Sequence, residues 1–179
     1  MERPGWRTFR AAGIALAVGL FALVMLDREL PGWLAETPPV AEQVLIEKGA
    51  RRLSLLRDNQ PYRRYRIALG PVPHGPKQQA GDGRTPEGVY AIAGRIPRSY
   101  QYKALRLSYP NHDDRMHAGH QGRDPGRMVL IHGQPNGLGW LAAITQRFNW
   151  TNGSIALRNG AMEAVYRAVS DDTPVVIRP

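Results

Sequence analysis

The chain contains no cysteine among its 179 residues. Disulfide bonds, zinc sites built on thiolates and a thiol nucleophile are therefore excluded for this sequence. Acidic residues are also few, because 15 Asp and Glu stand against 24 Lys and Arg, which gives a formal net charge of +9. A basic surface attracts anionic lipid, envelope polymers or nucleic acid. No basic stripe interleaved with aromatics and no known nucleic-acid motif occurs, so nucleic acid is not an expected partner.

The N-terminal part carries an uncharged apolar run at residues 11–26, with three Arg before it and Asp27 after it. This pattern predicts a signal anchor over residues 1–34, with a transmembrane helix. No small-x-small cleavage site follows the run, which favours a retained anchor over a cleaved signal. A buried helix of a cytosolic protein is a third interpretation, disfavoured because the run has no polar face. The basic N-terminal flank places the rest of the chain on the far side of the membrane.

Residues 35–42 are interpreted as a linker, and residues 43–179 as one domain, a length that can bury its own core. With 19 Gly and 15 Pro the composition is turn-rich, which favours a β-rich fold. Short runs with strand character recur, and Tyr65, Ile67 and Leu69 alternate with Arg64 and Arg66 as in a half-buried strand. The sequence therefore predicts a mainly β domain, a β-sandwich or half-open barrel with one or two short helices.

Two helices are expected in the second half of the domain. Residues 137–150 are compatible with a short one, and residues 159–169 place Met162, Val165 and Val169 on one face of an amphipathic helix with Asn159 as its N-cap. The polar segment between the strands at 104–109 and 128–133 is expected to be a solvated loop over a cleft.

Histidines in that polar segment raise the question of a metal site. Their spacing, at His112, His117 and His120 beside Asp113 and Asp114, matches no standard ligand pattern. We therefore expect no metal and no organic cofactor.

Three motifs carry the candidate chemistry: Gly81–Tyr90 (GDGRTPEGVY), Ile131-His132-Gly133, and Thr151-Asn152-Gly153-Ser154. Acyl transfer needs a nucleophile, a base and donors for an oxyanion. His132 is the natural base, and a nucleophile beside Gly153 can be presented in a tight turn. The first motif lacks the Lys-Ser/Thr ending of a phosphate-binding loop and is better interpreted as a turn that buttresses the cleft.

In this order and spacing the motifs resemble the L,D-transpeptidase (YkuD-like) family over about residues 43–179. The resemblance implies the family's β-sandwich fold, with His132 and Ser154 as catalytic residues. It also implies an oxyanion or structural role for Gly133 and Gly153. Substrate-binding roles are implied for four further residues of the last block: Thr151, Asn152, Arg158 and Asn159. Arg158 would hold a substrate carboxylate with its forked donors.

The sequence departs from the family at its nucleophile, because Ser154 stands where the family has cysteine. A serine hydroxyl is far less acidic than a thiol and needs a well-aligned base. Three interpretations stay open: a natural serine nucleophile, an engineered Cys-to-Ser change, or an inactive relative that only binds envelope polymer. The resemblance implies acyl transfer or hydrolysis on peptidoglycan stem peptides, at the bacterial inner membrane and facing the periplasm.

Overall fold

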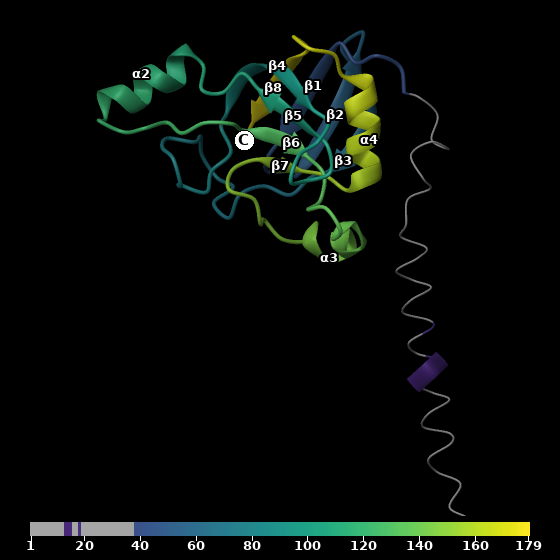
Figure 1. The fold of residues 1–179 in the computed structure, drawn as a ribbon. Coiled ribbons are helices and arrows are strands. Elements are labelled where there is room, and N and C mark those ends of the chain that lie inside the picture. The colour runs from purple at the N-terminus through teal and green to yellow at the C-terminus, as the bar shows by residue number, and fades with distance from the viewer. Residues whose placement is uncertain (1–12, 16–17, 19–37) are drawn as a thin grey trace, which may run out of the picture.

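The domain is built around one large sheet. The structure is a computed structural model that describes residues 13–15, 18 and 38–179. Eight strands lie in the order β3-β2-β1-β8-β4-β5-β6-β7 (Figure 1). Their bounds are β1 Gln43–Glu47, β2 Arg52–Arg57, β3 Gln60–Arg66, β4 Gly88–Ile96, β5 Ala104–Leu107, β6 Leu130–His132, β7 Ile155–Ala156 and β8 Pro174–Arg178. The predicted mainly β fold is confirmed.

The first three strands form the expected antiparallel meander. Asp58 and Asn59 make the turn between β2 and β3 with φ of 51° and 58°. Asp and Asn tolerate this left-handed conformation better than other non-glycine residues do, and tight hairpins require it. Arg64 and Arg66 of β3 are exposed with Tyr65 half-buried between them, as the alternation predicts. Ile67 and Leu69 are fully buried but lie beyond the end of β3, where Ala68 between them is buried too, so the alternation ends at Arg66.

The sheet curls until its two ends meet. Ala68, just after β3, exchanges two backbone hydrogen bonds with Ala156 of β7, at 2.9 and 2.8 Å. A sheet closed in this way encloses its apolar side chains without a second layer. The interior holds Val44, Ile46, Leu53, Leu55, Ile92, Leu105, Ile131, Ile155, Leu157, Val175 and Ile177.

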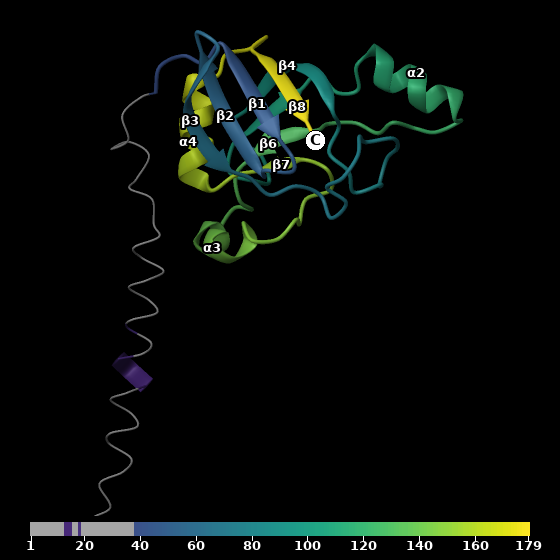
Figure 2. The ribbon, with the colours of Figure 1, turned by 180° about the vertical axis from the view of Figure 1, so that it is seen from behind.

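Helix α4 (Asn159–Ala168) covers one side of the sheet (Figures 1 and 2). Met162 and Val165 of the predicted stripe are fully buried. The expected N-cap was wrong: Arg158 occupies that position, and Asn159 is the first helical residue. Asn159 instead uses its side chain as an acceptor for the amide of Gln134, at 2.9 Å, which ties the helix start to the strand that carries His132.

The polar segment expected to be a loop contains a helix, α2 (His112–His120), so that prediction was wrong. Asn111 caps it, and Asp114 returns the bond in a capping box. Such a box satisfies two otherwise unpaired donors, so a helix with almost no buried face can form. The short helix expected at 137–150 is present as η1 (Gly139–Leu141) followed by α3 (Ala142–Thr145).

The predicted anchor at residues 11–26 lies almost entirely outside the described residues. Within the described part, no helix combines the length and apolar character that a membrane span requires.

Candidate active site

His132 ends strand β6 and is 3% exposed. Its Nδ1 lies 2.7 Å from the carbonyl oxygen of Gly133. A carbonyl oxygen only accepts, so Nδ1 carries the hydrogen and the neutral ring has a lone pair on Nε2. This is the tautomer that a general base requires.

The ring of His132 packs edge-on against Trp150, with 5.8 Å between ring centroids. Burial lowers the pKa of His132 below its ordinary value, and the bond to Gly133 opposes this in part. Loss of water around the ring disfavours the imidazolium form. His132 is therefore neutral at pH 7. The contact with Trp150 was not predicted from the sequence, because the position of a loop residue along the chain gives no sign of a ring contact.

Ser154 lies directly before β7, which runs parallel to β6. Ile131 pairs with Ile155, and both are fully buried in the interior. Because side chains alternate along strands, Ser154 and His132 fall on the opposite face from these isoleucines. Strand spacing puts such diagonal neighbours about 8 Å apart at their Cα atoms. The fold thus places the predicted base and nucleophile on one face of adjacent strands.

The Ser154 hydroxyl is engaged with the backbone. Its Oγ accepts a 3.2 Å hydrogen bond from the amide of Leu130, and none of the hydrogen bonds among residues 38–179 joins it to His132. Catalytic hydrogen bonds are often long or absent before substrate binds. A rotation about the serine χ1 is what would bring Oγ toward the imidazole.

The turn before Ser154 is held by Thr151, which is 4% exposed. Its hydroxyl donates to the carbonyl of Ser154 at 2.6 Å and accepts from the amide of Gly153 at 3.3 Å. Gly153 has φ of +105°, and a Cβ there would lie 2.4 Å from the carbonyl oxygen of Arg84. Only glycine fits this conformation and this close approach. Thr151 and Gly153 therefore shape the turn that presents Ser154.

Both glycines predicted near an oxyanion have their amides engaged in this conformation. Gly133 donates to the carbonyl of Tyr102 at 2.9 Å, and Gly153 donates to Thr151. Asn152 is exposed, and Arg158 precedes α4. The binding roles expected for Asn152, Arg158 and Asn159 stay predictions.

The Gly81–Tyr90 motif abuts the turn that precedes Ser154, as the buttress interpretation predicts. The carboxylate of Asp82 accepts from Lys77 and from the amides of Gln78, Gln79 and Arg84. This closes a tight loop whose Arg84 carbonyl contacts Gly153. Lys77 is 9% exposed, and its Nζ lies 3.7 Å from the position that a Cβ atom would take at Gly153. Sequence reasoning missed this residue.

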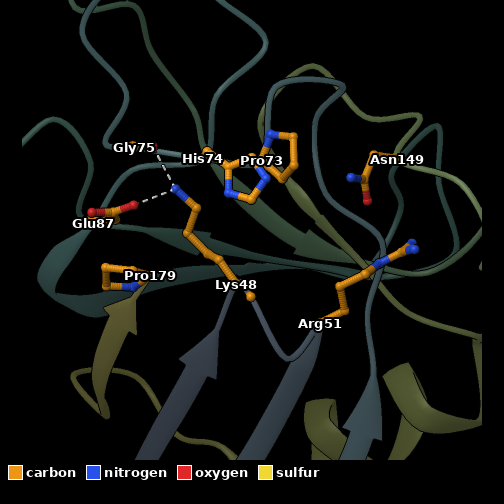
Figure 3. Close-up of a pocket in the computed structure, with 9 residues that line it drawn as sticks. Lys48, Arg51, Pro73, His74, Gly75, Glu87, Asn149 and Pro179 are labelled. Carbon is orange, nitrogen blue, oxygen red and sulfur yellow. Dashed lines mark hydrogen bonds and ion pairs between the residues drawn. The ribbon is translucent and has the colours of Figure 1, made fainter.

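A buried ion pair fixes the far end of the same loop. Lys48 reaches Glu87 at 2.7 Å and donates to the carbonyl of Gly75 (Figure 3). It also donates to the carbonyl of Thr85. This cluster borders a cavity of about 230 Å³ that Asn149 lines from the other side. The loop is therefore held at both ends, by Asp82 and by Glu87.

Gln134 is a second residue that sequence reasoning missed. It is fully buried, donates to the carbonyl of Leu157 at 2.7 Å, and accepts from Thr145 of α3 at 2.6 Å. Its backbone amide is held by Asn159. These bonds fix the chain just after His132, and only a long-range contact map could have revealed them.

The histidines of the polar segment lie on α2, away from His132. Among the described residues no group of three or more His, Cys, Asp or Glu side chains could hold a metal ion.

Several solved structures have a similar fold, and among them are proteins described as L,D-transpeptidases. The helical cell shape determining protein Pgp2 of Campylobacter jejuni is 26% identical with a TM-score of 0.59, covering 75% of this chain and 46% of Pgp2. An L,D-transpeptidase of Xylanimonas cellulosilytica is 15% identical with a TM-score of 0.53, covering 80% and 64%. The second likeness supports the fold alone. The fold is therefore that of an L,D-transpeptidase-like domain.

The family profile of the YkuD L,D-transpeptidase catalytic domain matches residues 41–177, and the chain belongs to this family. YafK of Escherichia coli (strain K12), whose name also places it with the L,D-transpeptidases, is 38% identical over 74 residues. That alignment covers 40% of this chain and 28% of YafK. The chain thus spans less than half the length of YafK and of Pgp2.

Proposed function

We propose that the domain is an acyltransferase of the cell envelope that acts on peptidoglycan stem peptides through an acyl-enzyme on Ser154. The observation that carries this proposal is the placement of His132, as its Nδ1–H tautomer, and Ser154 on one face of adjacent parallel strands. Membership of the YkuD family supports the substrate class.

The reaction would proceed in two stages. Ser154 Oγ attacks the acyl carbon of a stem-peptide amide while its proton passes to His132 Nε2. The tetrahedral intermediate then expels the amine, which takes the proton from the imidazolium, and an ester to Ser154 remains. An incoming amine would resolve this ester in cross-linking, and water would resolve it in hydrolysis.

Serine makes the alignment of the base critical. A hydroxyl is not ionised by a neighbouring imidazole, so its proton must leave as the C–O bond forms. The Gly133 carbonyl, which fixes the ring through Nδ1, is the orienting group available to His132. This carbonyl is neutral, whereas the group that orients the histidine in the Ser-His-Asp triad of serine hydrolases is a carboxylate. We therefore expect slower acylation than a triad with a carboxylate supports.

The direct test is covalent trapping. The protein is incubated with muropeptides or an activated acyl donor, and its intact mass is measured. We expect one adduct that peptide mapping locates on Ser154 and that Ser154→Ala lacks. Tight muropeptide binding with no adduct would instead support the second candidate, an inactive module that binds envelope polymer. The hydroxyl's bond to Leu130, rather than to His132, is what favours that candidate.

The pH dependence of acylation follows from the lowered pKa of His132. Only the neutral imidazole accepts a proton, so acylation should fall as the pH drops through the folded-state pKa. Since that pKa lies below the ordinary histidine value of 6.5, the midpoint of the acid limb should lie below pH 6.5. Adduct formation measured across pH 4–8 checks this, and a midpoint above 6.5 would contradict a buried base.

For its location we propose the bacterial inner membrane, with residues 1–34 as anchor, 35–42 as linker and the domain facing the periplasm. The apolar run at 11–26 with its basic flank supports this orientation. Protease protection of spheroplasts against intact cells tests it, since a periplasmic domain is cleaved only after the outer membrane is opened.

A further inference from the structure

An exposed apolar stripe runs along the helical segment that follows the His132 strand. Trp140, Ile144 and Phe148 are 59%, 57% and 62% exposed. They are spaced four residues apart along one short segment, with Trp140 in η1, Ile144 in α3 and Phe148 in the turn that follows. Segment 139–148 projects from the body of the domain (Figure 1). Contiguous apolar surface of this kind marks an interaction site.

A groove rich in arginine lies on the neighbouring hairpin. Its volume is about 380 Å³, and it is lined by Gly49, Ala50, Arg51, Arg52, Arg64, Tyr65 and Arg66. Arg52 and Arg66 are paired across β2 and β3, and like charges in that position repel. Arg52 has a carboxylate partner in Glu47, at 2.8 Å.

Arg51 joins the groove to the stripe. Its guanidinium donates to the carbonyls of Gln146, Arg147 and Phe148, at 3.2, 3.0 and 3.2 Å. All three are neutral acceptors, and no carboxylate among residues 38–179 forms an ion pair with Arg51, whose charge lies near that of Arg66. These bonds hold the segment that carries the stripe against the hairpin that carries the groove. We call the following side chains of the two neighbouring segments the docking face: Arg51, Arg64 and Arg66 from the hairpin, and Trp140, Ile144, Arg147 and Phe148 from the helical segment.

We propose that the docking face binds the surface of a bilayer that contains acidic phospholipids. The arginines would pair with headgroup phosphates through forked hydrogen bonds, and the stripe would enter the interfacial region, where Trp is favoured. A soluble anionic polymer would satisfy the arginines but leave the stripe in water. A second copy of the chain would bring the arginines of two docking faces together. The bilayer fits both halves of the surface.

Binding of the docking face to lipid is a property separate from the proposed acyl transfer and does not depend on it. Residues 1–34 would hold the chain at the membrane in any orientation, whereas the docking face would fix which side of the domain lies against the lipid. The effects of the anchor and of the docking face can therefore be distinguished by measuring which part of the domain the lipid protects from water.

The absence of cysteine makes a direct experiment possible. The full chain carrying Ile144→Cys is labelled with an environment-sensitive fluorophore and mixed with saturating vesicles, either of phosphatidylcholine alone or with added phosphatidylglycerol. Quenching by a water-soluble neutral quencher reports exposure. We expect protection at position 144 only with the acidic vesicles. A label at Met116→Cys, on α2 at the other end of the domain (Figure 1), should stay exposed in both.

Matched charge variants complete the test. Arg64→Gln with Arg66→Gln should lower the docking equilibrium constant about 25-fold, since each arginine near an anionic surface contributes about fivefold. Arg98→Gln with Arg127→Gln removes the same charge from other exposed positions and should leave protection intact. Equal quenching of the label at position 144 in the two vesicle types overturns the proposal. Protection that rises with protein concentration in the absence of lipid also overturns it, because the docking face would then bind a second copy of the chain. If the full chain does not float with vesicles of phosphatidylcholine alone, that result would contradict the anchor predicted at residues 1–34 but not the docking face.

Discussion

Replacing His132 with glutamine is expected to slow acylation of Ser154 about 10²–10⁴-fold, the usual contribution of a positioned general base. Glutamine is similar in size and can still hydrogen-bond, but it cannot accept the serine proton. The rate of adduct formation with an activated acyl donor, followed by intact mass, measures the effect. Thermal unfolding of the variant shows whether the fold is kept.

The control for this substitution is His117→Gln on α2. His117 is exposed and bonds only to Gln121 among the described side chains. Its replacement should leave the acylation rate unchanged. Acylation at the parent rate in the folded His132 variant would show that another group removes the proton.

Replacing Glu87 with glutamine is expected to cost about 3 kcal/mol of unfolding free energy, because it leaves a buried ammonium without its counter-charge. The Lys48 and Glu87 side chains are 1% and 17% exposed and lie 2.7 Å apart. Urea denaturation, compared with the parent, gives the difference.

An exposed pair in the same sheet supplies the comparison. Glu47 and Arg52 are 29% and 42% exposed, so Glu47→Gln should cost less than about 1 kcal/mol. Equal losses in the two variants would mean that the Lys48 pair contributes no more than a surface contact. A stability loss at Glu87 with slower acylation would also link the 70–88 loop to the catalytic turn.

Local patterns were enough to predict most of the fold. Alternation located the strands of the meander, and the period of α4 identified its buried face, because both depend on neighbouring residues. The helix α2 was missed because its stability comes from the capping box of Asn111 and Asp114 rather than from an apolar stripe. Asn159 was misassigned as a cap because its real partner, Gln134, lies 25 residues away.

The site could be predicted only as far as the family resemblance reached. The resemblance predicted His132 and Ser154 as catalytic residues, and the strand pairing places them on one face. The contacts that condition them come from segments distant in sequence: Trp150 against the imidazole, Arg84 against Gly153, and Thr145 with Gln134. No periodicity or motif encodes such contacts, so they needed coordinates.

The bridge between Ala68 and Ala156 has a consequence for how activity is acquired during folding. Strand β7 has only two residues, with β6 on one side and Ala68 on the other. Contacts this far apart along the chain are slow to form, because the entropy of closing the intervening loop must be overcome first. We expect the serine turn to become ordered only once the sheet has closed into a ring, so partly folded chains should be unable to modify envelope components.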